Sequence, residues 1–83
     1  MTATPPEVYA RILGDMRVVW GDVADFMLKK RLTDVHADAS RLTKADLGRI
    51  VQLLREKTLP PMLGPEGAAR KATQYMNWVK ELA

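Results

Sequence analysis

One stretch near the start of the chain, Thr4–Arg31, TPPEVYARILGDMRVVWGDVADFMLKKR, decides the fold. Its large apolar side chains recur every seven residues in three rows: Tyr9, Met16 and Val23; Ile12, Val19 and Phe26; Leu13, Trp20 and Met27. A repeat of this kind matches the period of about 3.6 residues per turn and is typical of a helix with one buried face. The sequence therefore predicts a first helix over residues 5–31.

The ends of this stretch carry signals for a helix start and stop. Thr4 is placed to cap the first turn, and Glu7 can reach back to complete a capping box. Lys29, Lys30 and Arg31 suit the negative C-terminal end of the helix dipole. Gly14 and Gly21 each weaken the helix by roughly 1 kcal/mol relative to alanine. A break after Leu13, with Asp15 as the new cap, is the main alternative to a continuous helix.

The later half of the chain predicts two further helices. Thr43 caps the first of them, which covers about 44–57 and must stop before Pro60-Pro61. The second begins at Pro65 and continues to about Leu82 with a regular apolar stripe. A short fourth helix is possible at about 33–41. No stretch alternates in the manner of a strand, so the expected fold is all-α, a compact bundle of three main helices in one domain, 1–83.

The predicted helix lengths do not match one another. At 1.5 Å per residue the first helix would be about 39 Å long, against roughly 21 and 26 Å for the others. Two shorter helices cannot cover the whole apolar stripe of the long one. Either the first helix breaks at Gly14, or part of its apolar stripe packs on another molecule. The second case predicts a homodimer.

Composition excludes several classes of protein. The 83 residues contain no cysteine, so a disulfide-stabilised secreted miniprotein and a thiolate zinc site are excluded. Apolar residues make up 47% of the chain, as in an ordinary folded domain. No apolar run approaches the ~20 residues of a membrane span, and the N-terminal residues lack the pattern of a signal peptide. The expected location is the cytoplasm, away from membranes.

No motif predicts catalysis, a cofactor or a metal. His36 and Ser40 could touch on a helical turn, with Asp34 and Asp38 nearby, but no glycine elbow or further ligand accompanies them. A polar connector held by local capping bonds explains the same residues. Likewise, the helix start at Gly64 lacks the Lys-Ser/Thr pattern of a phosphate loop. We therefore expect a protein that is not an enzyme.

The leading hypothesis is a non-catalytic protein-interaction module, a small adaptor or regulator that binds another protein or a second copy of itself. The module would bind by burying an apolar helix face, and tryptophan is favoured at the centres of interfaces. The candidate partner-binding residues are Trp20, Met27, Met62 and Trp78. Met62 belongs to the apolar segment Leu59–Leu63, which either docks into a partner or folds back to close the end of the bundle.

The alternative hypothesis is a small DNA- or RNA-binding regulator. Residues 1–28 hold two basic and four acidic side chains, whereas residues 29–83 hold eleven basic and six acidic ones. Such a basic segment could contact phosphates. The candidate nucleic-acid contacts are Lys29, Lys30, Arg31, Arg41, Lys44, Arg49 and Arg55. A helix-turn-helix unit needs a turn of 3–4 residues, and the predicted gap before Pro65 is longer than that.

Overall fold

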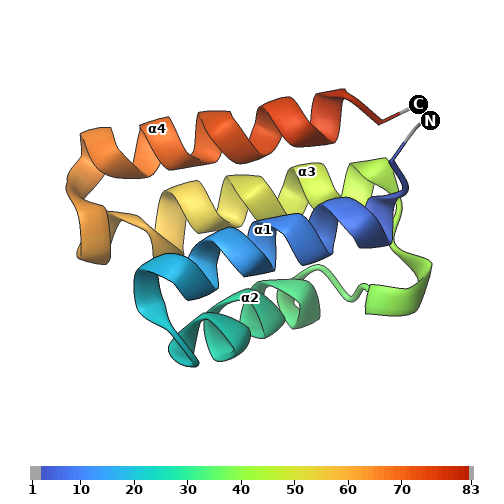
Figure 1. The fold of residues 1–83 in the computed structure, drawn as a ribbon, viewed down its shortest axis with the longest axis horizontal. Helices are drawn as coiled ribbons and strands as arrows, with labels where there is room; N and C mark the ends of the chain where they lie inside the picture. Colours follow the sequence, from blue (N-terminus) through green and yellow to red (C-terminus); the bar gives the residue numbers. More distant parts are fainter. Residues whose placement is uncertain (1–2, 83) are drawn as a thin grey trace.

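The structure, a computed structural model, describes residues 3–82 as an up-down-up-down bundle of helices (Figure 1). The elements are α1 (Pro5–Trp20), α2 (Val23–Asp34), a 3₁₀ turn (Ala39–Arg41), α3 (Lys44–Leu53), a π-turn (Leu54–Thr58) and α4 (Pro60–Lys80). The all-α bundle expected from the sequence is confirmed, with four main helices in place of three. Both ends of the described chain lie at one end of the bundle, opposite the α1–α2 corner and the α3–α4 connection.

The predicted first helix is two helices, and they part at Gly21 rather than at Gly14. Gly21 has φ 64° and ψ −141°, a conformation that only glycine adopts readily. Its N–H still donates to the Arg17 carbonyl at 2.8 Å, which closes the last turn of α1. The prediction of a continuous helix over 5–31 is therefore wrong, and so is the alternative break after Leu13, because Gly14 lies inside α1.

This break removes the mismatch of lengths. With 16 residues, α1 is about 24 Å long, comparable with its neighbours. The helix α2 folds back along α1 instead of extending it (Figure 1). The seven-residue spacing does not predict burial beyond the corner, because the chain reverses there and a different face of the second helix points toward the core. Val8, Ile12 and Met16 are buried in α1, whereas the later row members Val19, Val23 and Phe26 are exposed.

The two predicted N-caps are present. The Thr4 hydroxyl accepts a hydrogen bond from the Glu7 amide at 3.4 Å and donates to the Glu7 carboxylate at 3.0 Å. At the start of α3, Thr43 and Asp46 form a reciprocal capping box. The helix starts could therefore be read locally, because a cap satisfies backbone N–H groups within one turn.

The short helix predicted at about 33–41 is reduced to a single turn. The first residues of that range finish α2, and His36 follows with a left-handed φ of 55°. Only Ala39–Arg41 form a 3₁₀ turn, which the Asp38 carboxylate caps at the Ser40 amide. Leu42, just beyond the turn, is buried and anchors this connection to the core.

The second half follows the prediction more closely. Helix α3 and the π-turn together cover 44–58, against the predicted 44–57. The segment expected to be a loop before Pro65 is instead the first turn of α4, because prolines fit the first turn of a helix. Gly64, with φ 75°, kinks the chain between this turn and the rest of α4, which reaches Lys80. Leu59 is fully buried, so this residue closes the core at that end.

Candidate functional site

All the exposed large apolar side chains of the described chain lie in two segments at one end of the bundle. These residues are Val18, Val19, Val23, Phe26 and Met62. The first four surround the α1–α2 corner, and the fifth lies in the first turn of α4. Figure 1 shows both segments at the end opposite the chain termini. We call this surface the apolar end.

The corner explains why these side chains lie outside the core. Phe26 is 77% exposed, because it lies two residues from both Ala24 and Leu28, which form the buried face of α2. A step of two residues turns a helix by about 200°, so Phe26 points away from the core. Val18 is 86% exposed on α1 for a similar reason, two residues after the buried Met16.

An ion pair links the two helices at this corner. The Arg17 guanidinium donates to both Asp25 carboxylate oxygens, from Nε at 2.8 Å and from a terminal nitrogen at 3.0 Å. These hydrogen bonds lower the pKa of the Asp25 carboxyl below its ordinary value. A two-point contact of this kind restrains orientation more than a single bond does. The apolar end is thus presented on two helices in a defined arrangement.

The structure brings three of the four predicted partner-binding residues to the apolar end. Trp20 is the last residue of α1, Met27 is in the second turn of α2, and Met62 is in the first turn of α4. Trp20 and Met27 are half-buried against the core, and Met62 is 47% exposed. The sequence analysis missed Val18, Val19, Val23 and Phe26, because the heptad rows assign three of them to a core.

Trp78 lies apart from this group, near the other end of the bundle. Its ring is half-buried, with the Tyr75 ring at 5.5 Å between centroids and the Arg11 guanidinium 4.1 Å from its centroid. The cation over the indole face and the neighbouring aromatic ring hold Trp78 within one copy of the chain. Its position gives it a packing role between α4 and α1.

The seven predicted nucleic-acid contacts do not form one free basic stripe. Arg31 is only 7% exposed and pairs with the Asp34 carboxylate at 3.1 Å. The Lys44 ammonium donates to the Leu82 carbonyl at 2.9 Å. Arg49 pairs with the Asp46 carboxylate at 2.8 Å. The remaining four are exposed but spread over three elements: Lys29, Lys30, Arg41 and Arg55.

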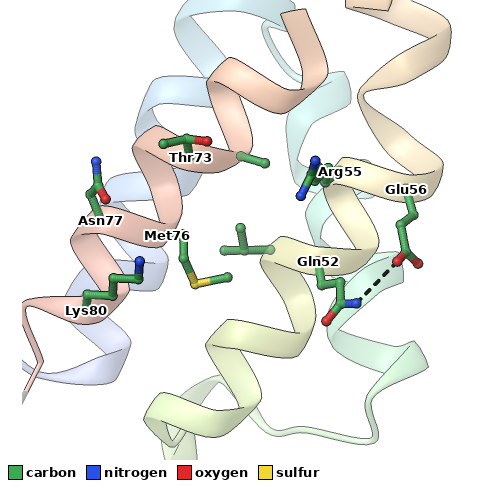
Figure 2. Close-up of a pocket in the computed structure, with 9 residues that line it drawn as sticks. Gln52, Arg55, Glu56, Thr73, Met76, Asn77 and Lys80 are labelled. Atoms are coloured by element: carbon green, nitrogen blue, oxygen red, sulfur yellow. Dashed lines mark hydrogen bonds between the residues drawn. The ribbon is translucent and has the colours of Figure 1, made fainter. Parts of the chain in front are cut away.

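A groove of about 570 Å³ lies between α4 and the α3–π-turn segment (Figure 2). Its floor is apolar and consists of Val51, Ala72 and Met76. Its polar rim consists of Gln52, Arg55, Glu56, Thr73, Asn77 and Lys80. The Gln52 amide donates to the Glu56 carboxylate at 3.3 Å, so this acidic group is engaged on the α3 side.

The polar connector has no arrangement that suggests catalysis. The Ser40 hydroxyl donates to the Asp38 carboxylate at 2.8 Å, so its partner is this acid and not the predicted His36. Hydrogen bonds from the Ser40 amide and hydroxyl lower the pKa of the Asp38 carboxyl. Across residues 3–82, no three His, Asp or Glu side chains are grouped closely enough to hold a metal ion.

The chain was compared with protein-family models, with curated proteins and with solved structures, and it matches none of them. Within the described residues, no helix has both the length and the apolar character needed to cross a membrane. What the molecule does must therefore be inferred from its own surface. Within residues 3–82, the apolar end and this groove both offer apolar surface to a ligand or partner.

Proposed function

We propose that this protein is a non-catalytic interaction module, acting in the cytoplasm as an adaptor or regulator, that pairs with a second copy of itself through the apolar end. One observation carries the proposal: every exposed large apolar side chain of the described residues lies in a segment at that end of the bundle. Scattered apolar residues are normal on a protein surface, whereas a concentration of them marks an interaction site.

Charge at this end supports a second copy as the partner. The corner carries one basic and two acidic side chains, Arg17, Asp22 and Asp25. Arg17 pairs with Asp25, and Arg55 and Glu56 line the groove, so Asp22 at the corner and Lys57 of the π-turn are the charges left to face a second copy. In a two-fold dimer each contact occurs twice, so Asp22 at the corner of one copy can face Lys57 of the other. The end is therefore self-complementary in charge.

The size of the end predicts a weak dimer. The two shorter dimensions of the molecule are 21 Å each, so its end covers roughly 440 Å². A stable interface buries about 800 Å² on each partner, and smaller contacts belong to transient complexes. Aromatic residues contribute most where contact area is limited, and Phe26 is the one exposed aromatic side chain among those at the apolar end. We expect association that depends on concentration, with Phe26 at its centre.

Chemical-shift changes on dilution test the surface directly. Amide resonances of residues 18–26 and 60–63 should shift between dilute and concentrated samples, while those of the 3₁₀ turn stay in place. Phe26→Lys should abolish the shifts. Ala10→Lys is the matched control, because it adds the same charge at an exposed position within α1. Shifts confined to another surface, or an equal effect of the two variants, would refute the proposal.

The nucleic-acid alternative has less support. Three of its seven residues, Arg31, Lys44 and Arg49, are already held by partners within the chain. Binding to random duplex at low salt would have to weaken steeply with added salt for this alternative to stand. A lack of any such binding leaves the apolar end as the better explanation.

A further inference from the structure

The groove between α3 and α4 is a second surface, and its chemistry differs from that of the apolar end. Its floor, Val51, Ala72 and Met76, combines two buried side chains with one half-buried methionine. Figure 2 shows the Met76 side chain turned from α4 toward α3. A volume of about 570 Å³ is within the range of ligand sites, roughly 300–1,000 Å³. An apolar side chain of a partner can therefore bind in the groove without any rearrangement of the core.

The rim of the groove has a net positive charge. Neither Arg55 nor Lys80 forms an ion pair with any carboxylate of residues 3–82. The one acidic group of the rim, Glu56, accepts a hydrogen bond from Gln52. The rim thus offers two available cations beside an apolar floor, which is complementary to a partner that is both apolar and acidic.

The positions of the two cations indicate the shape of that partner. Because α3 and α4 are antiparallel, Arg55 lies toward their connection and Lys80 toward the other end of the groove. The lining residues of α4 extend from Ala72 to Lys80, which corresponds to about 12 Å along the helix axis. Two side chains seven positions apart on a helix are separated by about 10.5 Å. A helix lying along the groove can therefore place one acidic residue near each cation.

We propose that the groove binds an amphipathic helix of a partner protein, with acidic residues at positions i and i+7 that face Arg55 and Lys80. Apolar residues between the two acids cover Met76 and Val51. A helix packs well into the groove between two others, and such helix-in-groove recognition uses anchors at positions i, i+3, i+4 and i+7. The site is separate from the apolar end, so it needs no second copy of the chain.

A synthetic helical peptide provides the probe. It carries two glutamates seven positions apart that bracket a pair of leucines in an alanine-rich background, and a second peptide has lysines in place of the glutamates. Fluorescence anisotropy should show the wild-type chain binding the glutamate peptide at least tenfold more tightly than the lysine peptide. Equal affinity for the two peptides, or no binding of the glutamate peptide at millimolar concentration, would overturn the proposal.

Charge-reversal variants locate the binding on the molecule. Arg55→Glu and Lys80→Glu should each weaken binding of the glutamate peptide about tenfold, and the double variant should prefer the lysine peptide. Arg70→Glu is the matched control, an exposed cation of α4 outside the groove. If Arg70→Glu weakens binding as much as the other two, the groove is not the site. Phe26→Lys should leave peptide binding unchanged, which separates this test from that of the dimer.

Discussion

At the scale of single residues, a polar link between α1 and α4 is the most consequential contact. The Tyr75 side chain is fully buried, and its hydroxyl donates to an Asp15 carboxylate oxygen at 2.6 Å. The Lys71 ammonium donates to the same oxygen at 2.8 Å. Burial alone would raise the pKa of the Asp15 carboxyl, but these two hydrogen bonds and the lysine charge lower it overall. Burial, together with the neighbouring carboxylate, raises the pKa of Tyr75 far above its ordinary value.

The lowered pKa of Asp15 predicts a pH-dependent contribution to stability. A carboxyl whose pKa is lower in the folded chain than in the unfolded chain stabilises the fold at pH values above the unfolded pKa of about 3.9. This stabilisation is lost as the pH falls through the folded pKa. Asp15→Asn should lower the free energy of unfolding by about 1 kcal/mol at pH 7. Urea denaturation should show a smaller difference in the free energy of unfolding between the wild-type chain and the variant near pH 2.5 than at pH 7. A difference independent of pH would contradict the assignment.

Arg31 illustrates a charge that the fold tolerates rather than needs. It is nearly buried and pairs with the half-exposed Asp34, while its Nε atom has no acceptor among the described residues. Replacing a buried charge by an apolar side chain of similar length is often neutral or stabilising, whereas removing only its partner is costly. Arg31→Met should leave the free energy of unfolding equal or higher. Asp34→Ala should lower it by about 1 kcal/mol, and the reverse order in thermal unfolding would refute this reading.

At the scale of the elements, the decisive feature is the choice between two Gly-Asp pairs, Gly14-Asp15 and Gly21-Asp22. Both pairs look alike in the sequence, so local rules cannot choose between them. In the structure, Lys71 and Tyr75 hold Asp15 in the middle of α1, and this long-range contact favours a continuous helix at Gly14. Gly21 alone of the two has the positive φ that ends a helix.

Alanine substitutions at the two glycines should have opposite effects. Gly14→Ala should raise the free energy of unfolding by up to about 1 kcal/mol, because the position is helical and a methyl group there meets nothing within 4 Å beyond its chain neighbours and the helix's own backbone. Gly21→Ala should lower it by about 1–2 kcal/mol, because alanine is strained at φ 64°. Chemical denaturation of both variants checks the pair. Stabilisation by Gly21→Ala would mean that the corner is misplaced.

The same long-range dependence explains what the sequence could and could not predict. Local spacing was enough to predict the helix starts at Thr4 and Thr43. It was also enough to predict the buried face of α4. The corner at Gly21 could not be predicted in this way. Because the corner was missed, Val19, Val23 and Phe26 were wrongly assigned to a core. Trp20 and Met27 were placed among the partner contacts because they lie along the apolar stripe of the predicted first helix, and Met62 because it lies in the apolar segment Leu59–Leu63. That they lie at one end of the bundle depends on the chain reversing at Gly21, which no local pattern specifies.

At the scale of the whole molecule, the two ends of the bundle differ in character. One end carries both ends of the described chain, and the other carries the exposed apolar side chains (Figure 1). An end-to-end dimer through the apolar end would leave the termini and the α3–α4 groove free on both copies. We therefore expect a module that can pair with itself and still present two peptide-binding grooves.

The mass of the unmodified chain in solution, measured by sedimentation equilibrium over a range of concentrations, tests the central claim most directly. The chain mass is 9.3 kDa. A contact of this size predicts a dissociation constant in the range of about 10 μM to 1 mM. The mean mass should therefore rise toward twice the chain mass as the concentration approaches about 1 mM, and Phe26→Lys should hold it at the monomer value. A wild-type chain that stays at 9.3 kDa throughout this range would contradict the account.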